Sequence, residues 1–203
     1  MSDFSELLQE MEAYGRTNRV PIINEKGIPV LLETVRQKCP HRVLEIGTAI
    51  GYSTLLIAYA AADDVVVDTL ELSGERAELA QSYIDRSPYR DRIKIHVGDA
   101  GENILKLTGQ YDFVFIDAAK GQYPDYFRKV YPLLSKDAVV VADNVLFRGY
   151  VLGDVECPRR FKTIVKRLRE YIELVTDSDE FHTVIREDGD GLAVSQRRPA
   201  ESE

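Results

Sequence analysis

Two acidic residues and an amide stand directly after runs of residues that are typical of strands. Residues 111–116 lead into Asp117, and residues 138–142 lead into Asp143 and Asn144. Neighbouring parallel strands lie about 4.8 Å apart, so these three side chains converge if the two strands are neighbours in one sheet. Two carboxylates and an amide oxygen suit a hard cation, which favours Mg²⁺, with Mn²⁺ or Ca²⁺ as alternatives, over zinc.

Lys120, three residues after Asp117, adds a group that can exchange a proton. A hydroxyl bound to a metal at this position becomes more acidic, and Lys120 could accept its proton or hold the resulting oxyanion. Ordinary alternatives stand beside this interpretation. Asp117 and Asp143 could simply cap the segments that follow them, and Lys120 could be a surface lysine.

A glycine-containing loop follows the first predicted strand, residues 43–46. Gly47 and Gly51 permit a sharp turn and close approach of the backbone to a ligand, and the helix that follows offers free N–H groups. The spacing is G-x-x-x-G, whereas dinucleotide sites prefer G-x-G-x-x-G. Glu45, just before the loop, would repel a pyrophosphate but suits a cationic amine or sulfonium. This favours S-adenosylmethionine over NAD, with a plain tight turn as the alternative.

Acidic residues also end the next two predicted strands. Glu71 could accept hydrogen bonds from both ribose hydroxyls, and the turn at Asp99 and Ala100 could meet an adenine amino group. Each of these acids could instead be a helix N-cap. Ligands of open α/β sheets bind beyond the carboxyl ends of the strands. Acids at three successive strand ends therefore predict one cofactor crevice.

The elements that must position these residues alternate between strand-like and helix-like segments, which indicates βαβ units and a parallel sheet. A turn at 187–191 joins the last two strands as an antiparallel hairpin. We therefore predict an α/β, Rossmann-like fold with a mostly parallel seven-stranded sheet, a C-terminal antiparallel hairpin and helices on both faces. The predicted strands are 43–46, 65–70, 93–97, 111–116, 138–142, 181–186 and 192–196, and the helices between them are 53–61, 74–86, 100–107, 122–134 and 158–176.

The region before the first strand contains two predicted helices, at about 3–17 and 26–38. Between them, the apolar run that begins at Val20 and ends at Ile23 should lie against other parts of the structure. No repeat or linker divides the chain, so we expect a single domain over residues 1–203. Residues 1–40 would form its N-terminal part and residues 41–203 its core.

Composition gives a first view of partners and location. The chain has 203 residues and a formal net charge of −8, which argues against nonspecific nucleic-acid binding by the whole surface. Cys39 and Cys157 fit neither a disulfide framework nor a zinc pattern, and no apolar run is long enough to span a bilayer. We therefore expect a cytoplasmic protein with no membrane segment.

One segment is strongly basic despite the acidic average. Six of its eleven residues carry positive charge, and four of the six repeat at helical spacing. The segment could be a solvated helix face or a stripe that contacts phosphates. Its cations are Arg159, Arg160, Lys162, Lys166, Arg167 and Arg169.

Together these motifs resemble the class I S-adenosylmethionine-dependent O-methyltransferases of the catechol and caffeoyl-CoA type, and most of all the bacterial tRNA 5-hydroxyuridine methyltransferases. The resemblance rests on VPII from Val20, LEIGTAIGYST from Leu44, FIDAAKGQY from Phe115, DNVLFRG from Asp143 and GDGLAVS from Gly189. It implies Mg²⁺-dependent methylation of the 5-hydroxyl of 5-hydroxyuridine at the tRNA wobble position, giving 5-methoxyuridine. It also implies a homodimer. The alternative is a small-molecule catechol or phenol O-methyltransferase that uses the same centre.

The resemblance also implies roles for individual residues and a lid function for the apolar run that ends at Ile23. Lys120 and Asp117 would be catalytic, and Asp117, Asp143 and Asn144 would hold the metal. The cofactor would be bound by Ile23, Glu45, Gly47, Ser53, Glu71, Asp99, Ala100 and Asp117.

Overall fold

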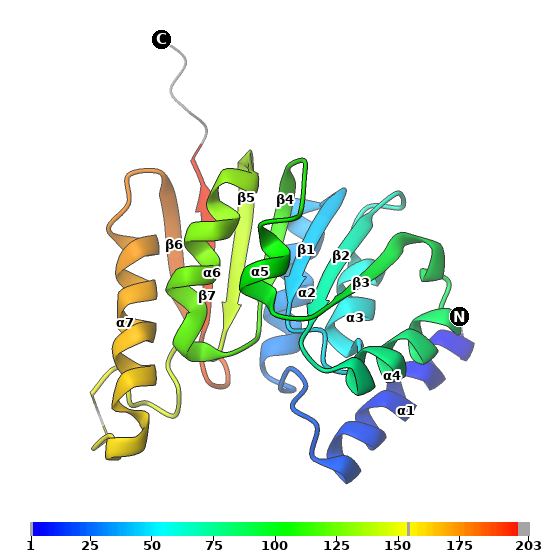
Figure 1. Ribbon diagram of the computed structural model, residues 1–203, viewed down its shortest axis with the longest axis horizontal. Coiled ribbons are helices and arrows are strands. Elements are labelled where there is room, and N and C mark those ends of the chain that lie inside the picture. The colour runs from blue at the N-terminus through cyan, green and yellow to red at the C-terminus, as the bar shows by residue number, and fades with distance from the viewer. Residues whose placement is uncertain (1, 154, 199–203) are drawn as a thin grey trace.

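The computed structural model describes residues 2–153 and 155–198 and contains one seven-stranded sheet (Figure 1). Strands β1 to β5 are parallel, while β7 is antiparallel to both β5 and β6. The predicted mostly parallel sheet with a C-terminal hairpin is therefore confirmed. In spatial order the strands are β3 (Ile93–Val97), β2 (Val66–Glu71), β1 (Arg42–Ile46), β4 (Tyr111–Ile116), β5 (Leu134–Asp143), β7 (Leu192–Arg197) and β6 (Phe181–Arg186).

Helices cover both faces of the sheet, as predicted. Buried side chains of the first four helices pack on one face, and those of the last three pack on the other. No helix in the two described ranges is long and apolar enough to cross a membrane. The helices are α1 (Ser2–Asn18), α2 (Gly27–Lys38), α3 (Tyr52–Ala60), α4 (Gly74–Asp85), α5 (Ala100–Ile104), α6 (Tyr123–Val130) and α7 (Lys162–Thr176).

The predicted helix 122–134 is too long. Helix α6 ends at Val130, and a short 3-10 turn containing Pro132 follows it, because proline cannot donate the next backbone hydrogen bond. Strand β5 then begins at Leu134, four residues earlier than expected, and pairs with Tyr111 across a register shift. The predicted helix 100–107 is likewise shorter, ending at Ile104.

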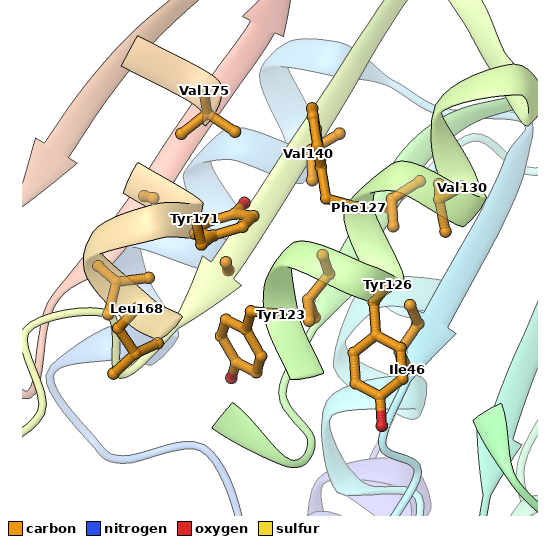
Figure 2. Close-up of a cluster of buried hydrophobic side chains, with 14 of the residues drawn as sticks. Ile46, Tyr123, Tyr126, Phe127, Val130, Val140, Leu168, Tyr171 and Val175 are labelled. Atoms are coloured by element: carbon orange, nitrogen blue, oxygen red, sulfur yellow. The ribbon is translucent and has the colours of Figure 1, made fainter. Parts of the chain in front are cut away.

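A cluster of aromatic rings fixes α6 and α7 on the sheet (Figure 2). The ring of Tyr171 on α7 meets those of Tyr123 and Phe127 on α6 edge to face, with centroids 5.7 and 5.9 Å apart. All three residues are buried. The Tyr123 hydroxyl donates a hydrogen bond of 2.9 Å to the backbone oxygen of Asp143. This core therefore also holds the end of β5 in place.

The ends of the three central strands lie at the same level. Ile46 of β1 is in register with Ile116 of β4, and Ile116 with Ala142 of β5, so the residues that follow them share one edge of the sheet. Gly47 has φ +106°, and a Cβ there would lie 2.0 Å from the backbone oxygen of Asp117. Only glycine lets the two chains approach so closely.

Candidate active site

A cavity of about 320 Å³ opens at this edge of the sheet. In Figure 1 the blue segment between α1 and α2 passes below the lower ends of the central strands. The cavity brings together most of the residues that the sequence predicts at a cofactor, and also Lys120 and Asn144. Those predicted cofactor residues are Ile23, Gly47, Ser53, Glu71, Asp99, Ala100 and Asp117.

The apolar run from Val20 supplies part of the cavity wall, as expected of a segment that lies against the structure. Pro21, Ile22 and Ile23 all line the cavity, and Ile23 is only 3% exposed. Its role as a lid stays a prediction.

Asp99 is a helix N-cap, which is the alternative that the sequence left open, whereas Glu71 is not, because Ser73 is the N-cap of α4. The Glu71 carboxylate accepts hydrogen bonds from the backbone N–H groups of Ala49 and Ser73, at 2.8 and 2.9 Å. Asp99 caps α5 by accepting from the N–H of Glu102 at 3.0 Å. Both carboxylates still line the cavity, and a carboxylate has about four lone-pair sites, so each keeps acceptors for a ligand.

Glu45 does not line the cavity, although the sequence places it at the cofactor. It is fully buried behind the wall, where it accepts hydrogen bonds from the hydroxyls of Ser53 and Thr69, both at 2.6 Å, and from Thr54. Burial raises the pKa of Glu45 to about 7, against the opposing effect of these three hydroxyls. Of this cluster, Ser53 stands between Glu45 and the cavity.

Asp117 and Asn144 line the cavity, whereas Asp143 is only 1% exposed behind Asn144. The predicted strand ends at Ala142, but β5 continues through Asp143 because this residue pairs with Leu192 of β7. Asn144 then adopts φ +56°, and its N–H donates to Asp143 Oδ1 at 2.7 Å.

The carboxyl groups of Asp117 and Asp143 interact electrostatically. Burial and the charge of Asp117 raise the pKa of Asp143 to about 7, and burial also raises the pKa of Asp117. Lys120 favours the ionised form of both groups. Strands β4 and β5, which carry the two aspartates at their ends, are neighbours, as the predicted convergence of these side chains requires.

The donor set at this corner fits a hard cation. Within the described residues there is no group of three or more His, Cys, Asp or Glu side chains arranged to hold a metal. The predicted trio is two carboxylates and the Asn144 amide, and a cation beside them would offset the cost of burying their charge. Asp117, Asp143 and Asn144 are the side chains that would hold it.

A second cavity, of about 670 Å³, adjoins the first. The two share Ile22, Ile23, Tyr52 and Asn144 as lining residues. Asp190, in the β6–β7 turn, lines the second cavity and adds a charge that raises the pKa of Asp143. The candidate metal corner thus lies where the two cavities meet.

Several lining residues were missed by reasoning from the sequence. Leu72 and Tyr126 line the first cavity, and Ile28 lines the second. Leu72 follows Glu71 directly, which was a usable signal in the sequence, and the structure shows its side chain 73% exposed. The sequence indicates that Tyr126 packs against the core from α6. The structure shows that Tyr126 is buried and also lines the cavity.

Comparison with known proteins agrees with this geometry. A family model described as O-methyltransferase matches residues 6–198. The chain is 34% identical to a catechol O-methyltransferase of Niastella koreensis, over 70% of this chain and 73% of that protein. It is 35% identical to a catechol O-methyltransferase of Mycobacterium tuberculosis, over 76% of this chain and 70% of that protein.

Among solved structures, the fold is similar to that of the O-methyltransferase TomG from Streptomyces achromogenes, which is involved in tomaymycin synthesis and was crystallised with S-adenosylmethionine. The TM-score is 0.82 and the identity 28%, covering 95% of this chain and 89% of TomG. The chain therefore belongs to the family of S-adenosylmethionine-dependent O-methyltransferases of the catechol and caffeoyl-CoA type.

Proposed function

We propose that the protein transfers the methyl group of S-adenosylmethionine to a hydroxyl of a small catechol or phenol, with a divalent cation such as Mg²⁺ at Asp117, Asp143 and Asn144. The observation that carries this proposal is the second cavity, which meets the cofactor cavity at Asn144. The names of the relatives in Niastella koreensis and Mycobacterium tuberculosis support the same acceptor class.

The second cavity suits a small aromatic acceptor. Its volume of about 670 Å³ lies within the range of about 300–1,000 Å³ that is typical of small-molecule sites. Ile22, Ile23, Ile28 and Tyr52 give it apolar walls. Its charged lining is three acids and two bases, namely Glu12, Glu25, Asp190, Arg16 and Lys26, so it offers no excess of positive charge to a polyanion.

The residues of the chain then divide the work of the reaction. Glu71 and Asp99 hold the cofactor, and the close contact of Gly47 with Asp117 sets the distance between cofactor and metal corner. The cation supplies Lewis-acid chemistry that makes a neighbouring hydroxyl easier to deprotonate. Lys120, which lines the cofactor cavity, would receive that proton at Nζ. The acceptor oxygen bonds to the methyl carbon as the carbon–sulfur bond breaks and its electron pair returns to sulfur.

A second candidate acceptor is the 5-hydroxyuridine of a tRNA, and one surface favours it. Arg148, Arg159, Arg160, Lys162 and Lys166 are all exposed, and all follow β5 in the sequence. We call these five the basic surface, and a row of cations of this kind can bind phosphates.

Two other cations of the basic segment serve the fold. Arg167 Nε donates to the backbone oxygen of Gly121 at 3.1 Å, and Arg169 Nε to that of Val151 at 3.0 Å. The part of the segment available to RNA is therefore smaller than the sequence indicates.

One assay distinguishes the two acceptors. The protein, Mg²⁺ and labelled S-adenosylmethionine are incubated with a dihydroxyphenyl acid or with tRNA that carries 5-hydroxyuridine, and products are identified by mass spectrometry. We expect the methylated phenol as the main product. Formation of 5-methoxyuridine without turnover of any catechol would overturn the proposal.

Charge reversal gives a matched control for that assay. In the first triple variant, Glu replaces three cations of the basic surface, Arg159, Lys162 and Lys166. In the control triple variant, Glu replaces three exposed cations outside the basic surface, Arg36, Lys94 and Lys136. Catechol turnover should be the same in both. Loss of tRNA methylation in the first triple variant alone would support the RNA acceptor.

A further inference from the structure

The loop that begins at the candidate metal corner, residues 144–148, has an unusual backbone, and we call it the metal-side loop. Asn144, Phe147 and Arg148 have φ of +56°, +41° and +59°, and none of them is glycine. Residues with a Cβ rarely adopt this left-handed region, and they persist there only where the surrounding structure holds them. The conformation of the loop therefore depends on the contacts that fix it.

The turn between β6 and β7 supplies those contacts. The N–H of Val145 donates to the backbone oxygen of Gly191 at 3.0 Å, and the N–H of Leu146 donates to that of Asp190 at 2.9 Å. The N–H of Arg148 donates to the side chain of Asp190, at 2.6 Å from Oδ1. Two of these three bonds would form with any residue type in the turn, whereas the third requires the Asp190 carboxylate.

The loop leads directly back to two of the groups that would hold a cation. The N–H of Phe147 donates to the backbone oxygen of Asn144 at 3.2 Å, which closes a turn over residues 144–147. The N–H of Asn144 in turn donates to Asp143 Oδ1 at 2.7 Å. The conformation of the metal-side loop therefore decides where the Asn144 amide and one oxygen of Asp143 lie.

We propose that Asp190 is a positioning residue for the candidate metal corner, whose carboxylate holds the N–H of Arg148, keeps the metal-side loop in its left-handed conformation and so keeps Asn144 and Asp143 in place for a cation. This inference rests on the proposed function, because it presumes a cation at Asp143 and Asn144. Asp190 lines the second cavity and not the first, so the proposed role is separate from cofactor binding.

Asp190 has a second means of acting on the corner, which is its charge, since this charge also raises the pKa of Asp143. Two substitutions separate the hydrogen bond from the charge. Asp190→Asn keeps the size and an acceptor oxygen for the N–H of Arg148 but removes the charge. Asp190→Glu keeps the charge but adds a methylene group, which displaces the acceptor from that N–H.

Asp188→Ala is the matched control. Asp188 stands in the same turn and carries the same charge, but its carboxylate accepts from Arg186 Nε at 3.3 Å rather than from the metal-side loop. Asp188→Ala therefore removes a negative charge from the turn and leaves the bond to Arg148 intact.

The first measurement is titration of the S-adenosylhomocysteine complex with Mn²⁺, with the free ion followed by electron paramagnetic resonance. We expect Asp190→Ala and Asp190→Glu to bind Mn²⁺ at least about tenfold more weakly than the wild type, as is typical when a partner of a metal ligand is lost. Asp190→Asn and Asp188→Ala should stay within about threefold of the wild type. The affinity for S-adenosylhomocysteine should stay within about threefold in all four variants.

The second measurement, backbone hydrogen exchange without metal, tests the loop itself. Peptides that contain residues 145–148 should exchange at least about tenfold faster in Asp190→Ala and Asp190→Glu, and as in the wild type in Asp190→Asn and Asp188→Ala. Peptides from β1 and β4 should exchange as in the wild type in every variant, which separates a local change from loss of the fold. If Asp190→Ala does not fold, the comparison of Asp190→Glu with Asp190→Asn carries the same test.

Two results would overturn the inference. One is Mn²⁺ binding by Asp190→Asn as weak as by Asp190→Ala, and the other is Mn²⁺ binding or loop exchange in Asp190→Glu equal to that of the wild type. A wild-type protein that binds Mn²⁺ no better than Asp143→Asn does would instead overturn the proposed metal centre, and with it the proposed function. The two failures are therefore distinguishable in one set of titrations.

Discussion

The contact between Gly47 and Asp117 makes Gly47→Ala the most informative change to the fold around the site. An alanine Cβ would lie 2.0 Å from the Asp117 backbone oxygen, which cannot swing away as a side chain could. The φ of +106° adds backbone strain of about 1–3 kcal/mol, and overpacking costs about another 1–3 kcal/mol. We expect the free energy of unfolding to fall by about 2–6 kcal/mol, a large part of a typical 5–15 kcal/mol.

Urea denaturation followed by circular dichroism measures this change, and Gly74→Ala is its control. Gly74 is the exposed first residue of α4 and has no atom within 4 Å of an added Cβ, so its replacement should change stability by less than about 0.5 kcal/mol. Gly47→Ala should also weaken S-adenosylhomocysteine binding, because Asp117 must move. If the two variants are equally stable, our reasoning about the strand ends is wrong.

Three further predictions concern buried polar groups. Burial raises the pKa of Glu45 from 4.5 to about 7. Protonation of this carboxyl therefore stabilises the folded protein fully below pH 4.5, and that stabilisation is lost as the pH rises through 7. Between pH 4.5 and 7 the free energy of unfolding of the wild type should fall by about 3 kcal/mol relative to that of Glu45→Gln in urea denaturation. A difference between the two proteins that does not change with pH would refute this prediction. Glu71→Ala should weaken S-adenosylhomocysteine binding at least about tenfold in calorimetry, since it removes a cavity acceptor, and unchanged affinity would contradict its role. Tyr123→Phe removes the hydrogen bond to the Asp143 backbone oxygen, so it should lower the free energy of unfolding by about 1 kcal/mol and slow metal-dependent turnover. Tyr171→Phe is the control, because the buried Tyr171 hydroxyl has no hydrogen-bond partner among the described residues. It should have a smaller effect in the same denaturation and turnover assays.

The sheet could be predicted from the sequence because its signals are local. Nearly continuous apolar strands separated by helical segments indicate a parallel sheet, and the acids at the strand ends then share one edge. Strand β5 was harder, since it crosses the polar run Ser135 to Asp137 before its buried half. Its early start depends on pairing with Tyr111, a contact between distant residues that no local pattern encodes.

Orientation within the site was the part that sequence could not supply. Alternation along β1 puts Glu45 on the sheet face that α1 to α4 cover, but the hydroxyls of Thr54 and Thr69 that enclose it come from other elements. Asp143 is turned inward because β7 pairs with it, which the sequence of β5 alone does not reveal. The residues of the site were thus predictable, while their division into lining and supporting groups required the fold.

The central claim, methyl transfer at a metal corner of two aspartates and an amide, is tested most directly by one comparison. Transfer from labelled S-adenosylmethionine to a dihydroxyphenyl acid is measured for the wild type with Mg²⁺, with a chelator, and for Asp143→Asn with Mg²⁺. We predict product only in the first case, together with S-adenosylhomocysteine affinity in the variant within about threefold of the wild type. Full turnover in the presence of chelator, or by Asp143→Asn, would contradict the proposed centre.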